Sequence, residues 1–316
     1  HDGKLLLELP NQFFYDWIQS HYVELIDRFV KKEYPDKLVI KYTVAPQNLP
    51  IEVKDANLVN ESNSSPRSNK AKKSLNENYT FSSFIEGSHN QFAKAAAKNV
   101  RQEPGQQSFN PLVIYGGVGM GKTHLLHAIG NGIIDDDSQK NIVCASSEKF
   151  TLDFISSIQK NKTVEFSKSY RNADVLLIDD IQFFQGKEQT QEQFFHTFNE
   201  LFQSGKQIVL TADRYPGEMI GLQDRLLSRF SSGLAVDIQP ANYETRVAIV
   251  MEKAEINGLK LPYDIIELIG SHIKNNIRDL ESTIIRLLAH SSLSNQEIDY
   301  NLAKKVIKES VGHISA

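Results

Sequence analysis

The amino-acid sequence predicts an α/β fold, in which a parallel sheet bears a helical lid and is preceded by a small partial α+β domain and a disordered linker. Three observations support this prediction. From about Asn78, short apolar segments alternate with segments of helical period, which is typical of a parallel sheet with helices on both faces. After about Asn242 only helical patterns remain. A polar stretch without periodicity separates these regions from an apolar amino-terminal segment.

Composition narrows the class of protein. A hydrophobic content of 40% and a charged content of 23% are ordinary for a soluble globular protein, and the net charge of −4 does not indicate a strongly basic nucleic-acid binder. The single cysteine, Cys144, excludes an internal disulfide and a cysteine-rich metal site. Neither a secretory segment nor an apolar run of the roughly 20 residues that span a bilayer is evident, so we expect a cytoplasmic protein.

Residues 1–53 predict a partial α+β interaction domain. Residues 5–9 and 38–44 resemble strands, and an amphipathic helix lies between them. Its apolar side chains recur every three or four positions, at Phe14, Trp17, Ile18, Tyr22, Leu25 and Phe29. Such a stripe is more often core than binding surface. Because the sequence begins at His1 with residues typical of a domain interior, we expect a fragment that lacks the first helices of this domain.

Residues 54–77 predict a flexible linker, because they are polar throughout and lack periodicity. Its lysines leave two interpretations open, a contact with nucleic acid and a solvated tether, and the tether is favoured.

Residues 78–239 predict the α/β core, and residues 240–298 a helical lid. In the core we expect strands over 112–115, 142–145, 174–178, 207–211 and 234–238, and helices over 121–133, 148–160 and 189–204. In the lid we expect helices over 242–256, 263–273 and 277–290. Residues 299–316 begin a further helix, over 299–310, which we expect to connect to a domain outside this sequence.

The segment 116–123 has the pattern G-x-x-x-x-G-K-T and follows an apolar strand. Glycines let backbone N–H groups curl around phosphates, and the helix that follows presents its positive end to the same anion. We expect Lys122 to bind the β- and γ-phosphates and the Thr123 hydroxyl to ligate Mg²⁺. The pattern predicts a nucleoside triphosphate site, with these nucleotide-binding residues: Gly117, Gly119, Met120, Gly121, Lys122, Thr123 and His124.

An apolar run over 175–178 ends in Asp179 and Asp180, a position where parallel sheets bind ligands. We expect Asp179 to hold Mg²⁺ through water, and Asp180 to orient or deprotonate the attacking water. The alternative is a solvated turn, which the phosphate loop in the same chain disfavours.

Three further charged residues are candidate site residues. Asp213 follows the strand over 207–211 and is either a nucleotide sensor or a turn cap. Arg229 lies four residues after Arg225, on the same helix face. By spacing alone, each of these arginines is a plain surface residue or one that reaches the site of a neighbouring subunit. Arg278, in the first turn of a lid helix and off its apolar stripe, either closes over the γ-phosphate or is a surface arginine.

Four blocks together resemble the bacterial DnaA family of chromosomal replication initiators. They span residues 116–131, 173–184, 192–199 and 210–230. The resemblance extends from about residue 5 to the end of the chain. It implies an AAA+ P-loop ATPase with weak, regulatory hydrolysis, whose bound ATP promotes self-assembly at the origin and duplex opening.

The resemblance also implies roles for single residues. Asp213 aligns with sensor 1, Arg229 with the arginine finger, Arg278 with sensor 2 and Arg225 with a second interface arginine. Residues 78–90, with Tyr79, Thr80, Phe81 and Phe84, resemble the segment that packs on the adenine. Ile155 and Lys187 fall at positions that contact single-stranded DNA, while Gln189 replaces a residue that is often basic, so weaker single-strand affinity is expected.

The implied cofactors are ATP and Mg²⁺. The implied partners are further copies of the chain, single-stranded origin DNA at the core, the replicative helicase at the amino-terminal domain, and acidic phospholipids. The family's duplex origin boxes are bound by a helix-turn-helix domain that nothing in 1–316 resembles, so we expect this fragment not to recognise them.

Two other classes of protein remain as alternatives. A helicase loader or replication regulator shares the ATPase core but usually lacks the amino-terminal unit and linker. A metabolic P-loop kinase is disfavoured by the pair Asp179 and Asp180 and by the helical lid with Arg278.

Overall fold

The computed structural model describes residues 4–9, 39–44, 74–274, 276–294 and 297–312. The chain divides into two units, residues 1–62 and 63–316, which are described separately.

In the first unit, strand β1 (Lys4–Leu9) pairs in parallel with strand β2 (Val39–Val44), with Leu5 opposite Ile40. Both predicted strands are therefore confirmed. The predicted helix between them, and the linker over 54–73, lie outside the described residues.

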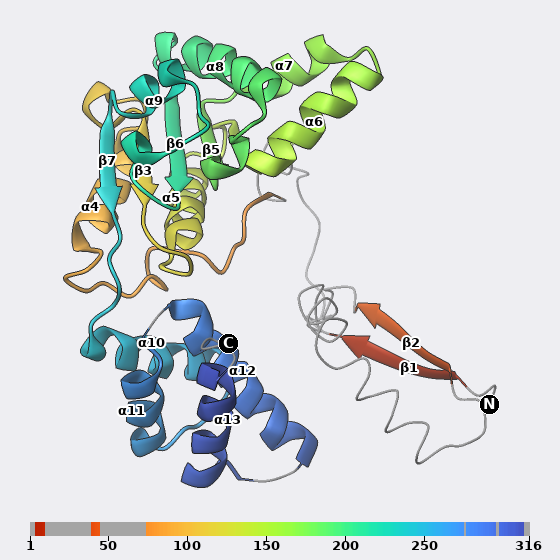
Figure 1. Cartoon of the computed structure of the whole chain (residues 1–316), viewed down its shortest axis with the longest axis vertical. Helices are drawn as coiled ribbons and strands as arrows, with labels where there is room; N and C mark the ends of the chain where they lie inside the picture. The colour runs from red at the N-terminus through yellow and green to blue at the C-terminus, as the bar shows by residue number, and fades with distance from the viewer. Residues whose placement is uncertain (1–3, 10–38, 45–73, 275, 295–296, 313–316) are drawn as a thin grey trace, which may run out of the picture. The chain divides into compact units, whose positions relative to one another are not determined.

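The second unit is built on a five-stranded sheet of order β4-β5-β6-β3-β7 (Figure 1). All neighbouring strands are parallel. Their side chains are mostly buried on both faces, which explains why they appear in the sequence as short continuous apolar runs. The strands are β3 (Leu112–Tyr115), β4 (Ile142–Ser146), β5 (Val175–Asp179), β6 (Gln207–Ala212) and β7 (Leu234–Asp237).

Helices cover both faces of this sheet. On one face α4 (Gln91–Gln102) and α5 (Lys122–Asp136) pack in a core cluster that includes Leu112 and Ile114 of β3. The other face carries Val113 and an aromatic cluster from helices α6 to α9. These helices are α6 (Ser147–Gln159), α7 (Thr163–Arg171), α8 (Glu188–Gln203) and α9 (Asp224–Phe230). Short 3₁₀ turns lie at η1 (Gln107–Phe109), η2 (Ile181–Phe184) and η3 (Pro216–Glu218).

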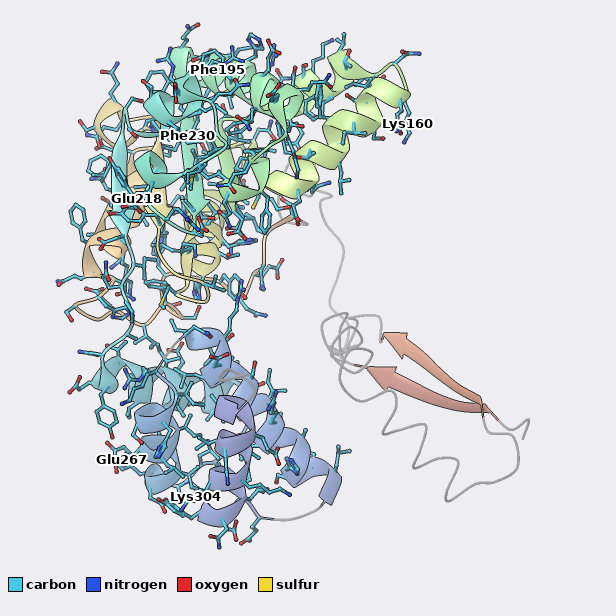
Figure 2. All side chains as sticks on the ribbon, viewed as in Figure 1. Lys160, Phe195, Glu218, Phe230, Glu267 and Lys304 are labelled. Carbon is cyan, nitrogen blue, oxygen red and sulfur yellow. The ribbon has the colours of Figure 1, made fainter. Side chains whose placement is uncertain are left out.

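A separate helical cluster forms the lid (Figure 1). It contains α10 (Tyr243–Ile256), α11 (Tyr263–His272), α12 (Ile277–Ser294) and α13 (Tyr300–Gly312). The helix expected over 299–310 is α13, and its Ala303, Val306 and Ile307 are buried with the other lid helices. Figure 2 shows Phe230 inside the sheet-bearing part and Lys304 on the lid. The predicted α/β class with a helical lid is confirmed.

The boundary predicted between linker and core requires a correction. Leu75 is only 6% exposed and belongs to the core cluster of α4 and α5. The Asn76 N–H donates to Nδ1 of His127 at 2.9 Å, and Asn131 donates to the Asn76 carbonyl at 2.8 Å. Residues 74–77 are therefore part of the folded unit, because one apolar side chain and a few backbone contacts anchor an otherwise polar stretch.

Within the described part of the chain, no helix is both long and apolar enough to span a membrane.

Candidate functional site

The glycine loop lies between β3 and α5, at the carboxyl ends of the central strands. Gly119 and Gly121 adopt left-handed backbone angles, with φ of 73° and 95°, which L side chains rarely adopt. A Cβ on Gly119 would lie 2.8 Å from Cβ of Asn276, so the loop also needs glycine for space. The Ile277 N–H donates to the Gly119 carbonyl at 2.9 Å, which ties the lid to this loop.

Lys122, the first residue of α5, is buried within the loop. Its Nζ donates to the carbonyls of Gly116 at 2.8 Å and Gly117 at 2.7 Å. Burial lowers the pKa of Lys122, while the nearby Asp180 and Asp179 act in the opposite direction. A buried ammonium held mainly by neutral carbonyls favours an anion, because an anion offsets its loss of hydration.

A cluster of side-chain oxygens lies at the carboxyl end of β5, around Asp179. Thr123 Oγ1 donates to Asp179 at 2.8 Å, and Thr211 also donates to Asp179. Burial raises the pKa of Asp179, against the effect of these two hydroxyl donors. A carboxylate beside a threonine hydroxyl supplies the oxygen ligands that Mg²⁺ prefers, so these residues fit the expected metal.

Asp180 is held in a left-handed conformation with φ of 56°. Its backbone N–H donates to Thr211 Oγ1 at 2.8 Å, and Gln182 donates to its carboxylate at 2.9 Å. This unusual backbone, fixed by hydrogen bonds, directs the carboxylate into the cavity beside Lys122.

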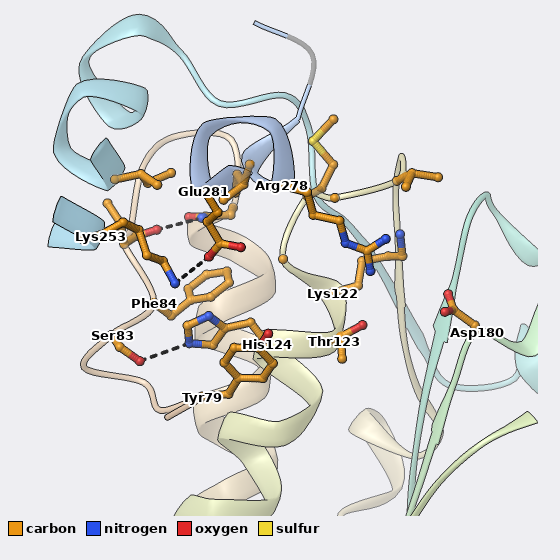
Figure 3. Close-up of a pocket in the computed structure, with 18 of the residues that line it drawn as sticks. Tyr79, Ser83, Phe84, Lys122, Thr123, His124, Asp180, Lys253, Arg278 and Glu281 are labelled. Atoms are coloured by element: carbon orange, nitrogen blue, oxygen red, sulfur yellow. Dashed lines mark hydrogen bonds and ion pairs between the residues drawn. The ribbon is translucent and has the colours of Figure 1, made fainter. Parts of the chain in front are cut away.

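A cavity of about 260 Å³ joins the core to the lid (Figure 3). One end is lined by charged groups, among them Lys122, Asp180, Asp213 and Arg278. Arg278 extends from the lid toward Lys122 in Figure 3. The other end is lined by Tyr79, Phe84 and other members of residues 79–90, and by four lid residues: Ile249, Glu252, Lys253 and Glu281. A charged end and an aromatic end match a triphosphate and a base.

His124 lies in the aromatic part of this cavity. Its ring stacks on Tyr79 at a centroid distance of 4.7 Å and meets Phe84 edge-on at 5.2 Å. Nε2 hydrogen-bonds to the Thr80 carbonyl at 3.0 Å and lies 3.3 Å from Ser83 Oγ. Burial is the main cause that lowers the pKa of His124 to about 4.

Comparison with known families decides which kind of site this is. The model of the bacterial DnaA ATPase domain matches residues 75–237, which is more than half of the chain. The chain belongs to the DnaA family. The model of the DnaA N-terminal domain matches residues 1–32. This DnaA-family chain therefore carries an ATPase domain.

Solved DnaA structures resemble the chain closely. Domain III of the replication initiation protein DnaA from Thermotoga maritima is 42% identical, with a TM-score of 0.72, over 74% of this chain and 98% of that chain. AMPPCP-bound DnaA from Aquifex aeolicus is 37% identical, with a TM-score of 0.62, over 68% of this chain and 66% of that chain. Replication initiator DnaA bound to AMPPCP and single-stranded DNA is 31% identical, with a TM-score of 0.62, over 75% and 82%.

The fold is shared more widely than the family. A single-site variant of RuvB from Thermotoga maritima is 18% identical, with a TM-score of 0.54, over 73% of this chain and 71% of that chain. At this identity the likeness concerns the fold alone.

The geometry of this DnaA chain separates the predicted site residues into two sets. Gly119, Met120, Gly121, Lys122, Thr123, His124, Asp180, Asp213 and Arg278 line the cavity, whereas Gly117 and Asp179 adjoin it through Lys122 and Thr123. Arg229 does not line it. Arg229 lies over the Phe202 ring at 6.0 Å, and Arg225 over the Phe195 ring at 4.7 Å, both on α9.

The two predicted single-strand positions also lie outside the cavity. Ile155 is 45% exposed on α6, and Leu152 and Ile158 are exposed on the same helix. Lys187 is the residue that precedes α8, and Gln189 is exposed in its first turn. Both helices belong to the face of the sheet that carries the aromatic cluster.

The sequence did not indicate that lid residues contribute to the aromatic end of the cavity. Lys253 of α10 and Glu281 of α12 form an ion pair of 2.6 Å that lies above Phe84 in Figure 3. No motif marks these residues. Their positions beside the buried stripe of each lid helix were the single feature of the sequence that placed them near the cavity.

Proposed function

We propose that this DnaA-family chain is an ATP-dependent initiator of chromosome replication, which assembles on the origin and promotes duplex opening when ATP is bound. The cavity shared by core and lid is the observation that carries the proposal. Lys122 of the core and Arg278 of the lid line the same charged end, so a triphosphate bound there contacts both parts of the unit. Binding of ATP rather than its hydrolysis then sets the relation of lid to core.

Hydrolysis resets this switch. Thr123 and Asp179 would hold Mg²⁺, which would supply positive charge beside the phosphates. Asp180 orients the attacking water or accepts its proton, and Asp213 senses the γ-phosphate. The rate is low because the cavity of one chain contains Arg278 but lacks a second arginine that the reaction needs.

That arginine is Arg229, given by the next copy of the chain. Its position on α9, away from the cavity of its own chain, supports a role in trans. Arg225 on the same helix contributes to the same contact between subunits. Assembly and hydrolysis are therefore coupled through one helix.

DNA is bound through another surface. Ile155 and Lys187 contact single-stranded DNA, in keeping with the related DnaA whose structure contains single-stranded DNA. Residues 1–53 bind the replicative helicase, acidic phospholipids are a further partner, and the site of action is the cytoplasm. Duplex origin boxes are not recognised by residues 1–316.

Exchange of Lys187 for alanine tests the DNA part of the proposal. We expect ATP-dependent affinity for a labelled single strand to fall about fivefold to tenfold, because one phosphate contact and its counterion release are lost. Fluorescence anisotropy at matched salt measures it, with Ile155→Ala as the second variant and Lys304→Ala on the lid as the control. Equal affinity of wild type and both variants contradicts the assignment, and a preference for origin-box over random duplex contradicts the expected absence of a duplex reader.

A further inference from the structure

One ring nitrogen of His124 anchors the side chain. Nε2 lies 3.0 Å from the Thr80 carbonyl, which accepts hydrogen bonds and donates none. The proton of the neutral imidazole is therefore on Nε2. At pH 8 the ordinary pKa of histidine is enough to make the ring neutral. The contact with the Thr80 carbonyl then selects the tautomer that is protonated on Nε2.

The other nitrogen, Nδ1, then carries a lone pair and accepts hydrogen bonds only. It lies on the side of the ring that faces Phe84 and the lid (Figure 3). Across residues 74–274, 276–294 and 297–312, no side chain or backbone donor bonds to Nδ1. Lys253, the cation on that side, is already paired with Glu281 at 2.6 Å.

The surroundings restrict what reaches this lone pair. Tyr79 stacks on one face of the ring and Phe84 meets it edge-on, so His124 is fixed between two aromatic side chains. His124 lies at the aromatic end of the cavity, on the opposite side from Asp180 (Figure 3). An unpaired acceptor that is fixed in place and lines the cavity distinguishes ligands that carry a donor from ligands that do not.

We propose that His124 Nδ1 accepts a hydrogen bond from the nucleoside part of the bound nucleotide and sets selectivity among nucleoside triphosphates. Adenine carries an exocyclic amine, a donor, where guanine carries a carbonyl oxygen, which repels the lone pair. A ribose hydroxyl is the second donor available in the same molecule. The inference rests on the proposed function, because it requires that the cavity binds ATP.

The expected size follows from one neutral hydrogen bond. Such a bond contributes about 1 kcal/mol, and an acceptor left facing a carbonyl costs somewhat more, so wild type should favour ATP over GTP by about tenfold or more. Removal of the acceptor should reduce this preference by about the same factor. The charged end of the cavity contributes equally to both nucleotides and does not enter the ratio.

The test measures equilibrium dissociation constants of the full chain at pH 8 by competition against a fluorescent ATP analogue. The competitors are ATP, GTP, purine riboside triphosphate, which lacks the exocyclic amine, and 2′-deoxy-ATP and 3′-deoxy-ATP. His124→Gln keeps an amide donor for the Thr80 carbonyl, and His124→Phe keeps a ring beside Tyr79. Thermal unfolding of both variants identifies any loss that comes from folding.

If both variants lose the preference for ATP over GTP and over purine riboside triphosphate, the exocyclic amine of adenine is the donor to Nδ1. If the variants lose only the preference for ATP over 2′-deoxy-ATP or 3′-deoxy-ATP, a ribose hydroxyl is the donor. Either result supports the proposal. Unchanged ratios in both folded variants overturn it. Wild type that binds no nucleotide refutes the proposed function itself.

Discussion

Exchange of Arg229 for alanine leaves ATP affinity within about twofold of wild type and lowers the hydrolysis rate by about a thousandfold, the lower range for an arginine finger. The position of Arg229 explains why ATP affinity is retained. Arg229 lies on α9 over the Phe202 ring and does not line the cavity of its own chain, so its loss removes no contact from ATP in that chain. It removes the charge that a neighbouring chain offers to the transition state. ATP-dependent assembly is lost with it.

The measurements are steady-state phosphate release and nucleotide titration on the same preparation. Arg101→Ala is the matched control, because Arg101 of α4 forms an ion pair of 2.7 Å with Asp136 of α5, and these helices cover the opposite face of the sheet from α9. This exposed pair contributes at most about 1 kcal/mol, so the control retains hydrolysis and assembly. Intact ATP-dependent oligomers of the Arg229 variant would refute the role in trans.

Exchange of Lys122 for alanine abolishes measurable ATP binding. A charge-assisted hydrogen bond contributes about 1.5–3 kcal/mol, so loss of the contacts of this amine with two phosphates lowers affinity by about a hundredfold or more. The variant also leaves the carbonyls of Gly116 and Gly117 without their present donor. Titration with a fluorescent nucleotide measures the effect.

Lys206→Ala controls for the loss of a lysine as such. Lys206 pairs with Asp174 at 2.6 Å beside the amino-terminal ends of β5 and β6, at the opposite edge of the sheet from the glycine loop. We expect this variant to bind ATP as wild type does. Nucleotide affinity that is unchanged in Lys122→Ala would remove the phosphate-loop assignment.

The strands and the charged end of the cavity were predictable from local sequence. Each strand is a short apolar run, and the loop over 116–123 combines glycines with a lysine and a threonine at fixed spacing. Asp179 and Asp180 follow such a run, so the rule that ligands bind at the carboxyl ends of parallel strands places them near Lys122. Little long-range information was needed.

The helices α4 and α7 were not predicted. In α4 the buried Ala93, Ala96, Ala97 and Val100 recur at helical spacing, so the amphipathic pattern of this helix is present in the sequence. In α7 two buried aromatics, Phe166 and Tyr170, are separated by serine and lysine. Packing against β3 and β7 stabilises α4, and packing against α6 and α8 stabilises α7.

The base end of the cavity depended on contacts between distant segments. Lys253 and Glu281 meet because two lid helices pack together, and His124 meets the Thr80 carbonyl because residues 78–84 cross α5. Leu75 joined the core although its neighbours are polar. None of these pairings has a spacing that a sequence pattern could reveal.

Sedimentation velocity of the wild-type chain with Mg²⁺ and either ATP or ADP tests the central claim, that ATP binding is an assembly switch. We expect concentration-dependent larger species with ATP and a single small species with ADP. The same distribution of species with both nucleotides, at concentrations where each saturates the cavity, would contradict the switch.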